Sequence, residues 1–285
     1  MKKRFGCKVY KLAIDGGFTC PNRDGTLDSR GCIFCSRGGS GAFAQSRELS
    51  ITEQLDRAKS LVADKNRDGK YMAYFQPFTN TYAPADELLK KYSEAIADSD
   101  IVALSVGTRP DCLGDDVLEV LDTINRIKPV FVELGLQTIH PETADYIRRG
   151  YSLDVYDRAV DALHKIGVNV VTHLIIGLPG ESVSDMLESV RYVCNVTDGI
   201  KLQLLHVLEN TDLADEYRQG RVSVLSLEEY SDIIAKCISI IPENVVVHRI
   251  TGDGAKSELI APMWSADKKR VINTLNKALE VIDEN

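Results

Sequence analysis

Short apolar runs rich in Val, Ile and Leu alternate with amphipathic segments along most of the chain. In the amphipathic segments, apolar residues recur roughly every three or four positions, which is the spacing of one helix face. The apolar runs predict strands at residues 7–14, 71–75, 101–105, 130–136, 168–176, 200–207 and 245–250. The amphipathic segments predict helices at residues 50–63, 84–97, 115–127, 153–166, 182–193 and 226–240, and a closing helix with Val271, Leu275, Leu279 and Ile282 on one face. A serine followed three residues later by glutamate predicts capping boxes at Ser50 and Ser226.

Apolar strands separated by amphipathic helices indicate a parallel sheet covered by helices. Roughly six or seven such units predict an α/β fold, namely a partial (β/α)6-type parallel barrel, similar to a TIM barrel, with an additional C-terminal strand and helix. No linker, low-complexity tract or repeat interrupts the pattern. We therefore expect a single domain over residues 1–285, with a core at about 7–210 and a C-terminal extension at about 211–285.

Composition and charge narrow the class of protein. The chain has 285 residues, of which 44% are hydrophobic and 27% charged, as in an ordinary globular protein. No apolar run approaches the roughly 20 residues of a membrane span, and no apolar segment follows the basic start, so we expect a cytoplasmic protein without membrane association. The net charge of −8 argues against a basic surface over the whole protein, although a local basic groove remains compatible with it.

The candidate chemistry lies in a glycine-rich loop that follows the first predicted strand. This loop holds Cys20, Cys32 and Cys35, three of the seven cysteines. The last two can chelate one metal centre from a single turn, and the first can join them by loop closure. Three thiolates leave one iron of a four-iron cluster open, whereas electron-carrying clusters normally have four cysteine ligands. Zinc is the alternative, but the first histidine, His140, is far away in the sequence. We expect the other four cysteines to be packing residues.

The motifs GFTCPNRDGT, GCIFCS and GSGAFA in this loop resemble the radical S-adenosylmethionine (SAM) superfamily. Within it, the chain resembles a bacterial family typified by YhcC and YtqA, which is related to the branch of the Elongator catalytic subunit. The resemblance implies that Cys20, Cys32 and Cys35 hold a 4Fe-4S cluster and that SAM binds its open iron. It further implies reductive cleavage of SAM to methionine and a 5′-deoxyadenosyl radical, with an electron donor such as a flavodoxin or a ferredoxin.

The same resemblance implies cofactor-binding residues after or within later strands. Residues 76–82 stand where the superfamily usually has Gly-Gly-Glu, and the segment 173–181 is similar to its G-x-I-x-G-x-x-x-E element, with His173 in place of the first glycine. A basic element at 148–149 is similar to the one that reaches the methionine carboxylate, without indicating which arginine does so. The implied cofactor-binding residues are Thr79, Asn80, Glu133, Gln137, Arg148, Arg149, His173, Ile175, Gly177, Glu181 and His206. Glu133 lies inside an apolar strand, so it needs a partner, either in a salt bridge or in the cofactor site.

The sequence leaves the substrate open and indicates no catalytic residue. The resemblance to the Elongator subunit suggests a tRNA base, whereas the acidic composition favours a small molecule or a protein. Aromatic residues at 71–82, the turn at Gly252–Gly254 and the basic run at 268–270 are segments that could face the substrate. Core packing, for the aromatic residues, and a solvated helix start, for the basic run, are the simpler interpretations. A different class of function is a non-catalytic regulatory α/β protein that binds a cluster or zinc.

Overall fold

The computed structural model describes residues 2–39, 41, 44–66, 69–252, 254 and 256–283. Ser40, Ala42 and Phe43 of the third loop motif, Asp253 of the expected turn and the side chain of Ile282 lie outside the described residues. The chain forms two compact units. The first contains Met1–Ser29, Gly38–Gly135 and Asp154–Val170, and the second contains Arg30–Arg37, Leu136–Leu153 and Val171–Asn285.

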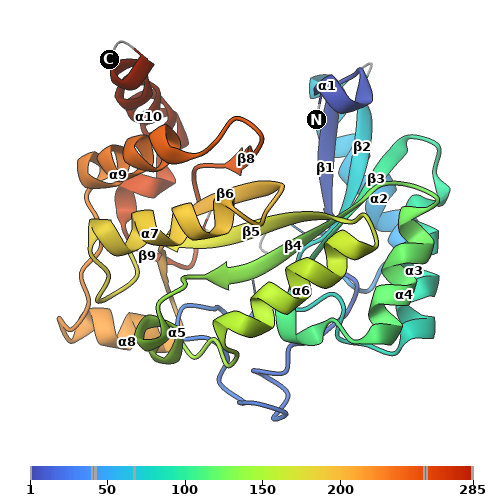
Figure 1. The fold of residues 1–285 in the computed structure, drawn as a ribbon, viewed down its shortest axis with the longest axis horizontal. Helices are drawn as coiled ribbons and strands as arrows, with labels where there is room; N and C mark the ends of the chain where they lie inside the picture. Colours follow the sequence, from blue (N-terminus) through green and yellow to red (C-terminus); the bar gives the residue numbers. More distant parts are fainter. Residues whose placement is uncertain are drawn as a thin grey trace. The chain divides into compact units, whose positions relative to one another are not determined.

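The first unit is built on parallel strands in the order β1-β2-β3-β4. β2 is buried at every position from Tyr71 to Phe75, as expected for a strand covered on both faces. Leu12, Ala73 and Leu104 continue the apolar core across the neighbouring strands, and α3 packs beside α4 (Figure 1). The elements are α1 (Lys2–Phe5), β1 (Val9–Ile14), α2 (Ile51–Val62), η1 (Ala63–Lys65), β2 (Lys70–Phe75), α3 (Ala85–Ala97), β3 (Ile101–Thr108), η2 (Pro110–Cys112), α4 (Asp115–Asn125), β4 (Val130–Gln137) and α6 (Leu153–Lys165).

The second unit contains the parallel strands β5-β6-β8 and a separate antiparallel pair, β7 and β9. Helix α9 packs against both α7 and α10. The elements are α5 (Pro141–Tyr146), β5 (Asn169–Ile176), α7 (Val183–Cys194), β6 (Gly199–Leu204), β7 (Val207–Leu208), α8 (Asp212–Arg218), α9 (Leu227–Ile240), β8 (Val246–Arg249), β9 (Leu259–Ala261), η3 (Met263–Ala266) and α10 (Lys268–Asp283).

The predicted α/β class with parallel strands is confirmed, and both predicted capping boxes form, at Ser50 with Glu53 and at Ser226 with Glu229. The boundaries differ most at the predicted strand 200–207. It ends at Leu204, and Val207 instead begins the short pair of β7 with β9. The helices α5 and α8 are absent from the prediction because each is too short to show a helical period. Among the described residues, no helix combines the length and apolarity of a membrane span.

Candidate functional site

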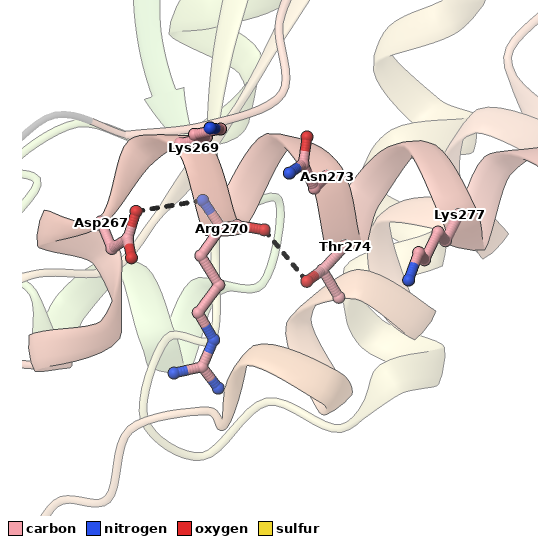
Figure 2. Close-up of a pocket in the computed structure, with 6 residues that line it drawn as sticks. All are labelled: Asp267, Lys269, Arg270, Asn273, Thr274 and Lys277. Atoms are coloured by element: carbon pink, nitrogen blue, oxygen red, sulfur yellow. Dashed lines mark hydrogen bonds between the residues drawn. The ribbon is translucent and has the colours of Figure 1, made fainter.

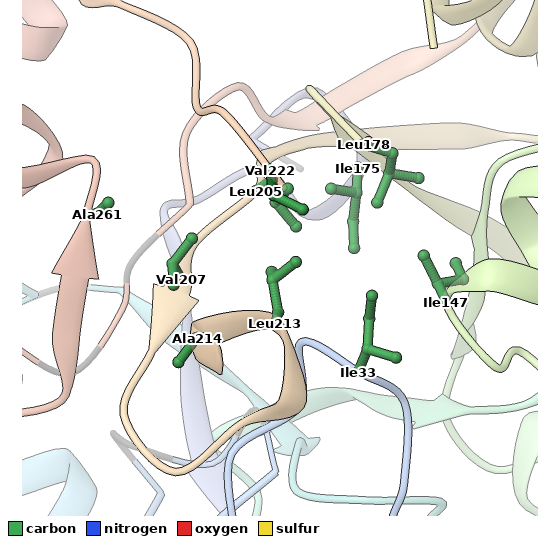
Figure 3. Close-up of a cluster of buried hydrophobic side chains, with 10 residues drawn as sticks. All are labelled: Ile33, Ile147, Ile175, Leu178, Leu205, Val207, Leu213, Ala214, Val222 and Ala261. Atoms are coloured by element: carbon green, nitrogen blue, oxygen red, sulfur yellow. The ribbon is translucent and has the colours of Figure 1, made fainter. Parts of the chain in front are cut away.

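The segment Cys32–Cys35 is a tight turn anchored in the core of the second unit. The Cys35 amide donates to the Cys32 carbonyl at 3.0 Å, and the Ile33 amide donates to the Ile147 carbonyl at 3.3 Å. The Leu213 amide in turn donates to the Ile33 carbonyl at 2.9 Å. Figure 3 shows the Ile33 side chain in the buried apolar cluster with Ile147 and Leu213, and Ile33 itself is 7% exposed. The residues between the two cysteines therefore hold both thiols in place.

Cys20 lies in a turn of its own in the first unit. The amides of Arg23 and Asp24 donate to the Cys20 carbonyl at 2.8 and 3.2 Å, and the Leu27 amide donates to the Pro21 carbonyl at 2.8 Å. These bonds fix the backbone and leave the thiol half-buried, like those of Cys32 and Cys35. All seven cysteines lie in the described part of the chain, and none forms a disulfide.

The other cysteines differ in burial. Cys194 and Cys237 are buried, and burial raises the pKa of their thiols to about 11 and about 12. Both therefore stay protonated at neutral pH, as expected of packing residues. Cys112 is half-buried, and burial, followed by the nearby Asp111 carboxylate, raises the pKa of its thiol to about 12.

Asn80 contains a buried acceptor that nothing in the described chain satisfies. Its side chain is fully buried, and Nδ2 donates to the carbonyls of Phe75 and Gly107 at 3.1 and 2.8 Å. Oδ1 has no hydrogen-bond partner among the described residues. The preceding Thr79 amide donates to the carbonyl of Thr19, which adjoins Cys20, at 3.1 Å. An unpaired buried acceptor is rare in native proteins and calls for an explanation such as a bound ligand.

Glu133 has the partner that its burial requires. Glu133 is 1% exposed, and its carboxylate accepts a hydrogen bond from Ser105 Oγ at 2.7 Å and forms an ion pair with Lys11 of β1. The Lys11 side chain is 27% exposed, so this ion pair connects a buried charge to one near the surface. The pairing satisfies the carboxylate within the sheet, and the expected contact with the cofactor stays a prediction.

Gln137 ends β4 with a strained backbone. Its φ of +71° is a left-handed value that a non-glycine residue rarely adopts, and its Oε1 has no hydrogen-bond partner among the described residues. Arg149 holds this turn on both sides, because Nη1 donates to the carbonyls of Leu136 and Thr138 at 3.2 and 2.6 Å. The buried Arg149 thus positions Gln137.

The structure separates the roles of the two neighbouring arginines. Arg149 Nε also donates to the Tyr151 carbonyl at 2.9 Å, so this side chain hydrogen-bonds to the backbone of its surroundings. Arg148 takes the left-handed position after α5, with φ +57°, where glycine is usual. Its guanidinium pairs with Asp212 at 2.6 Å, and its carbonyl accepts a weak hydrogen bond from the Cys32 thiol at 3.6 Å. Arg148 therefore adjoins a candidate cluster ligand.

The segment 173–181 runs from β5 into the turn before α7. Ile175 belongs to the same apolar cluster as Ile33, and Gly177 has φ +89°, at which a Cβ atom would also meet Leu225 at 2.9 Å. Glu181 accepts a hydrogen bond from Thr138, yet burial outweighs this bond and raises the pKa of the carboxyl.

The two histidines expected near the cofactor are engaged within the second unit. His173 Nδ1 accepts from the Gln203 amide at 3.1 Å, since the amide nitrogen can only donate. His206 Nε2 lies 3.2 Å from Ser265 Oγ. These bonds orient both rings, and cofactor contact by either histidine stays a prediction.

A further group of potential metal ligands lies at the start of α7. His140, Asp185 and Glu188 bring one ligand atom each within 4.8 Å of one another. Asp185, however, accepts from the amide and hydroxyl of Ser182 at 2.7 and 2.8 Å, as the capping box of α7 requires. His140 Nε2 lies 2.9 Å from the Asp185 carbonyl, so His140 and Asp185 both have partners at the start of the helix.

Comparison with known proteins identifies the family. Residues 28–193 match the model of the radical SAM superfamily. The chain belongs to this superfamily. Residues 197–281 match the radical SAM C-terminal domain. The chain is 44% identical to YtqA of Bacillus subtilis over 98% of its own length and 87% of that protein, and 39% identical to YhcC of Escherichia coli over 94% and 86%. The predicted family is confirmed, and the chain is a radical SAM enzyme.

More distant relatives lie in the Elongator branch. The chain is 29% identical to the tRNA uridine(34) acetyltransferase of Methanocaldococcus jannaschii, over 66% of this chain and 36% of that protein. Among solved structures, Elp3 of Methanocaldococcus infernus is similar with a TM-score of 0.69 and 20% identity, over 94% of this chain and 63% of the other. This likeness confirms the predicted fold class, the partial parallel β/α barrel of radical SAM enzymes.

Sequence reasoning missed the residues that support the candidate site. Ile33, Lys11 and Asp212 each contact a predicted site residue or its segment. Ile33 had a signal, since an isoleucine inside a Cys-x-x-Cys turn must bury its side chain somewhere. Lys11 and Asp212 have no such sequence signal, because charged residues of their kind are common throughout the chain.

Proposed function

We propose that this radical SAM enzyme binds a 4Fe-4S cluster through Cys20, Cys32 and Cys35 and cleaves SAM reductively. The observation that carries the proposal is the anchoring of the Cys32–Cys35 turn, in which Ile33 is buried while the flanking thiols remain half-buried. Three thiols without disulfide partners are the donor set that leaves one iron open for a substrate. Zinc, which would need a fourth ligand for a closed site, suits this set less well.

The unpaired buried acceptors suit the polar groups of SAM. We assign the Asn80 Oδ1 acceptor to the SAM amino group, where it takes the place of the missing Gly-Gly-Glu element. Gln137, whose Oε1 also lacks a partner in the described chain, is assigned to the ribose hydroxyls. Arg148 is assigned to the methionine carboxylate in preference to Arg149, whose guanidinium donates to the backbone carbonyls of Leu136, Thr138 and Tyr151. Thr79, Glu133, His173, Ile175, Gly177, Glu181 and His206 complete the proposed cofactor surroundings.

A 4Fe-4S cluster held by Cys20, Cys32 and Cys35 would supply, once reduced, the electron for the reductive cleavage of SAM. The chain's own residues hold the thiols, orient the SAM amino acid and keep water away through the apolar side chains around Ile33. A flavodoxin or a ferredoxin is the proposed source of the electron.

Anaerobic reconstitution with iron and sulfide tests the cluster. We expect about four irons per chain, a broad iron–sulfur absorption band, and 5′-deoxyadenosine after addition of SAM and dithionite. Cys32→Ala should lose the band and the product, whereas the matched control Cys7→Ala should keep both. One zinc per chain with no iron–sulfur band would refute the proposal.

The substrate that we propose is an RNA base, supported by a basic face on α10. Lys269, Arg270 and Lys277 are exposed, carry no ion pair within the described chain and lie around a depression of about 310 Å³. Figure 2 shows Arg270 and Lys277 extending to the same side of the helix as Thr274. Unpaired cations on a protein of net charge −8 match a phosphate backbone. One of the distant relatives is a tRNA uridine(34) acetyltransferase, which adds support.

RNA binding is tested by its dependence on salt. We expect tRNA affinity to fall steeply between low and physiological salt, and the triple variant Lys269→Glu/Arg270→Glu/Lys277→Glu to lower the slope by about two to three counterions. Lys236→Glu is the control, because Lys236 on α9 is already paired with Asp232. Affinity independent of salt would favour a small-molecule substrate instead.

A further inference from the structure

A cavity of about 590 Å³ lies in the first unit, among the segments that follow β1, β2 and β3. Its walls come from the stretch after Cys20, from residues 81–84 and from residues 111–117. This volume is typical of small-molecule sites, and ligands of parallel sheets bind beyond the carboxyl ends of the strands. None of the residues assigned above to the cluster or to SAM lines the cavity. It is therefore a separate feature of the molecule.

The apolar part of the wall is suited to a flat ring. Two proline rings, Pro21 and Pro84, face the cavity together with Leu27 and Val117. Leu27 is 52% exposed, and a ligand in the cavity would remove part of its side chain from water. Tyr82 adds an aromatic ring, which prefers to pack against planar groups.

The polar groups of the wall provide acceptors and hydroxyls. The Tyr82 hydroxyl lies 2.9 Å from Thr26 Oγ1, and the oxygens of this pair can accept a hydrogen bond from a ligand. Each Asp111 carboxylate oxygen accepts one N–H of Arg109, at 2.9 and 2.7 Å. Because each carboxylate oxygen accepts more than one hydrogen bond, Asp111 can also accept from the N–H or O–H groups of a ligand.

The described wall of the cavity offers no cationic side chain to an anion. Among the described residues that line the cavity there is no lysine, arginine or histidine. The carboxylate in the wall of the cavity is that of Asp111. Its ion pair with Arg109 neutralises the charges of both groups, so the Arg109 guanidinium is not a free cation for a ligand. A phosphate placed here would lose its water without gaining a cationic partner.

We propose that this cavity binds a neutral heterocycle of nucleoside size, without its phosphate, as the part of the substrate that undergoes reaction. The assignment to the substrate rests on the proposed function, because the cavity begins at Pro21, next to the proposed cluster ligand Cys20. The ring lies against Pro21, Pro84 and Leu27, and its donors face Asp111.

The test is equilibrium binding to the reconstituted protein, followed by ligand-observed NMR. The probes are uridine and adenosine, each beside its 5′-monophosphate. We expect at least one nucleoside to bind, and its monophosphate to bind about tenfold or more weakly, which corresponds to about one lost charge partner. Equal or tighter binding of the monophosphates would overturn the proposal, as would the absence of binding by both nucleosides.

Two variants locate the binding. Ala83→Phe fills the cavity and should weaken nucleoside binding about tenfold or more, whereas Leu61→Phe, at a 74% exposed position of α2, should leave it unchanged. Leu27→Lys supplies the missing cation at an exposed position, so it should reverse the preference toward the monophosphate even if Ala83→Phe folds poorly. A preference unchanged in Leu27→Lys would place the probe elsewhere and refute the assignment.

SAM itself separates this inference from the proposed function. SAM should not displace the nucleoside, and displacement would show that the cavity belongs to the SAM site, against the proposal. If the wild type makes no 5′-deoxyadenosine, the proposed function fails whatever the nucleosides do. If it makes 5′-deoxyadenosine and neither nucleoside binds, only the cavity assignment fails.

Discussion

Ile33→Ala should destabilise the Cys32–Cys35 turn strongly, although the cysteines on either side of Ile33 are only half-buried. Ile33 is 7% exposed, so nearly the whole side chain leaves water on folding. The substitution removes about three carbon groups at ~0.8 kcal/mol each, or about 2.4 kcal/mol. A residual void of about 40 Å³ adds ~1 kcal/mol, which gives about 3 kcal/mol in total, within the range of buried isoleucine truncations. Ile33→Val, which removes one group, should cost about 1 kcal/mol.

The assay is urea denaturation of the unreconstituted protein, followed by iron content after reconstitution. Ile272→Ala is the control, because Ile272 is 42% exposed on α10 and should change stability by less than about 0.5 kcal/mol. If the turn detaches locally instead of unfolding the protein, the same ~3 kcal/mol appears as a cluster affinity weakened by about a hundredfold. Wild-type stability together with wild-type iron retention in Ile33→Ala would refute the reasoning.

Three other predictions follow from buried polar groups. Lys11→Met leaves the Glu133 carboxylate buried without its cation, so unfolding free energy should fall by about 3–5 kcal/mol, and the double variant Lys11→Met/Glu133→Leu should recover most of it; no recovery in urea denaturation would contradict this. Burial raises the pKa of Glu181, so its stabilising contribution is complete below the ordinary pKa and is lost as pH rises through the folded one. The stability of the wild type relative to Glu181→Gln should therefore decline over that rise, and a constant difference would disprove the shift. Gln137→Gly should be more stable than Gln137→Ala by about 1 kcal/mol, because only glycine adopts the positive φ without strain. Both variants should bind SAM more weakly in calorimetry. Equal stability of the two variants would show that the backbone of Gln137 is not strained.

The parallel strands could be predicted because their signal is local, and the assignment of the three cysteines to a cluster, which rests on an equally local spacing, stays a prediction. Apolar runs such as residues 130–136 are recognisable without knowledge of their neighbours, and Cys32 and Cys35 lie within one turn. The partner of Glu133 could not be predicted in the same way. Lys11 lies 122 positions away, and the two meet only because β1, β2, β3 and β4 lie side by side in register. From the sequence alone, a lysine in an alternating strand is interpreted as a solvent-facing residue.

The choice between Arg148 and Arg149 shows a second limit of sequence reasoning. Both carry the same guanidinium, and adjacent residues offer no period that would separate an inward from an outward side chain. The left-handed backbone of Arg148 supports the proposed assignment, because it turns the chain after α5 so that Arg149 reaches the carbonyls around Gln137. A positive φ at an arginine has no reliable sequence signal, since glycine is the usual residue there.

The strained positions follow a pattern that links stability to function. Of the four non-glycine residues with positive φ among the described residues, Phe78, Gln137 and Arg148 lie in the segments assigned to SAM. Each costs about 1 kcal/mol or more and persists only where the surrounding contacts fix it. Glycine would avoid this cost but would supply no amide, guanidinium or aromatic ring. The Arg149 bonds fix the turn at Gln137 and the Asp212 pair fixes Arg148, which is the kind of preorganisation that the proposed cofactor site requires.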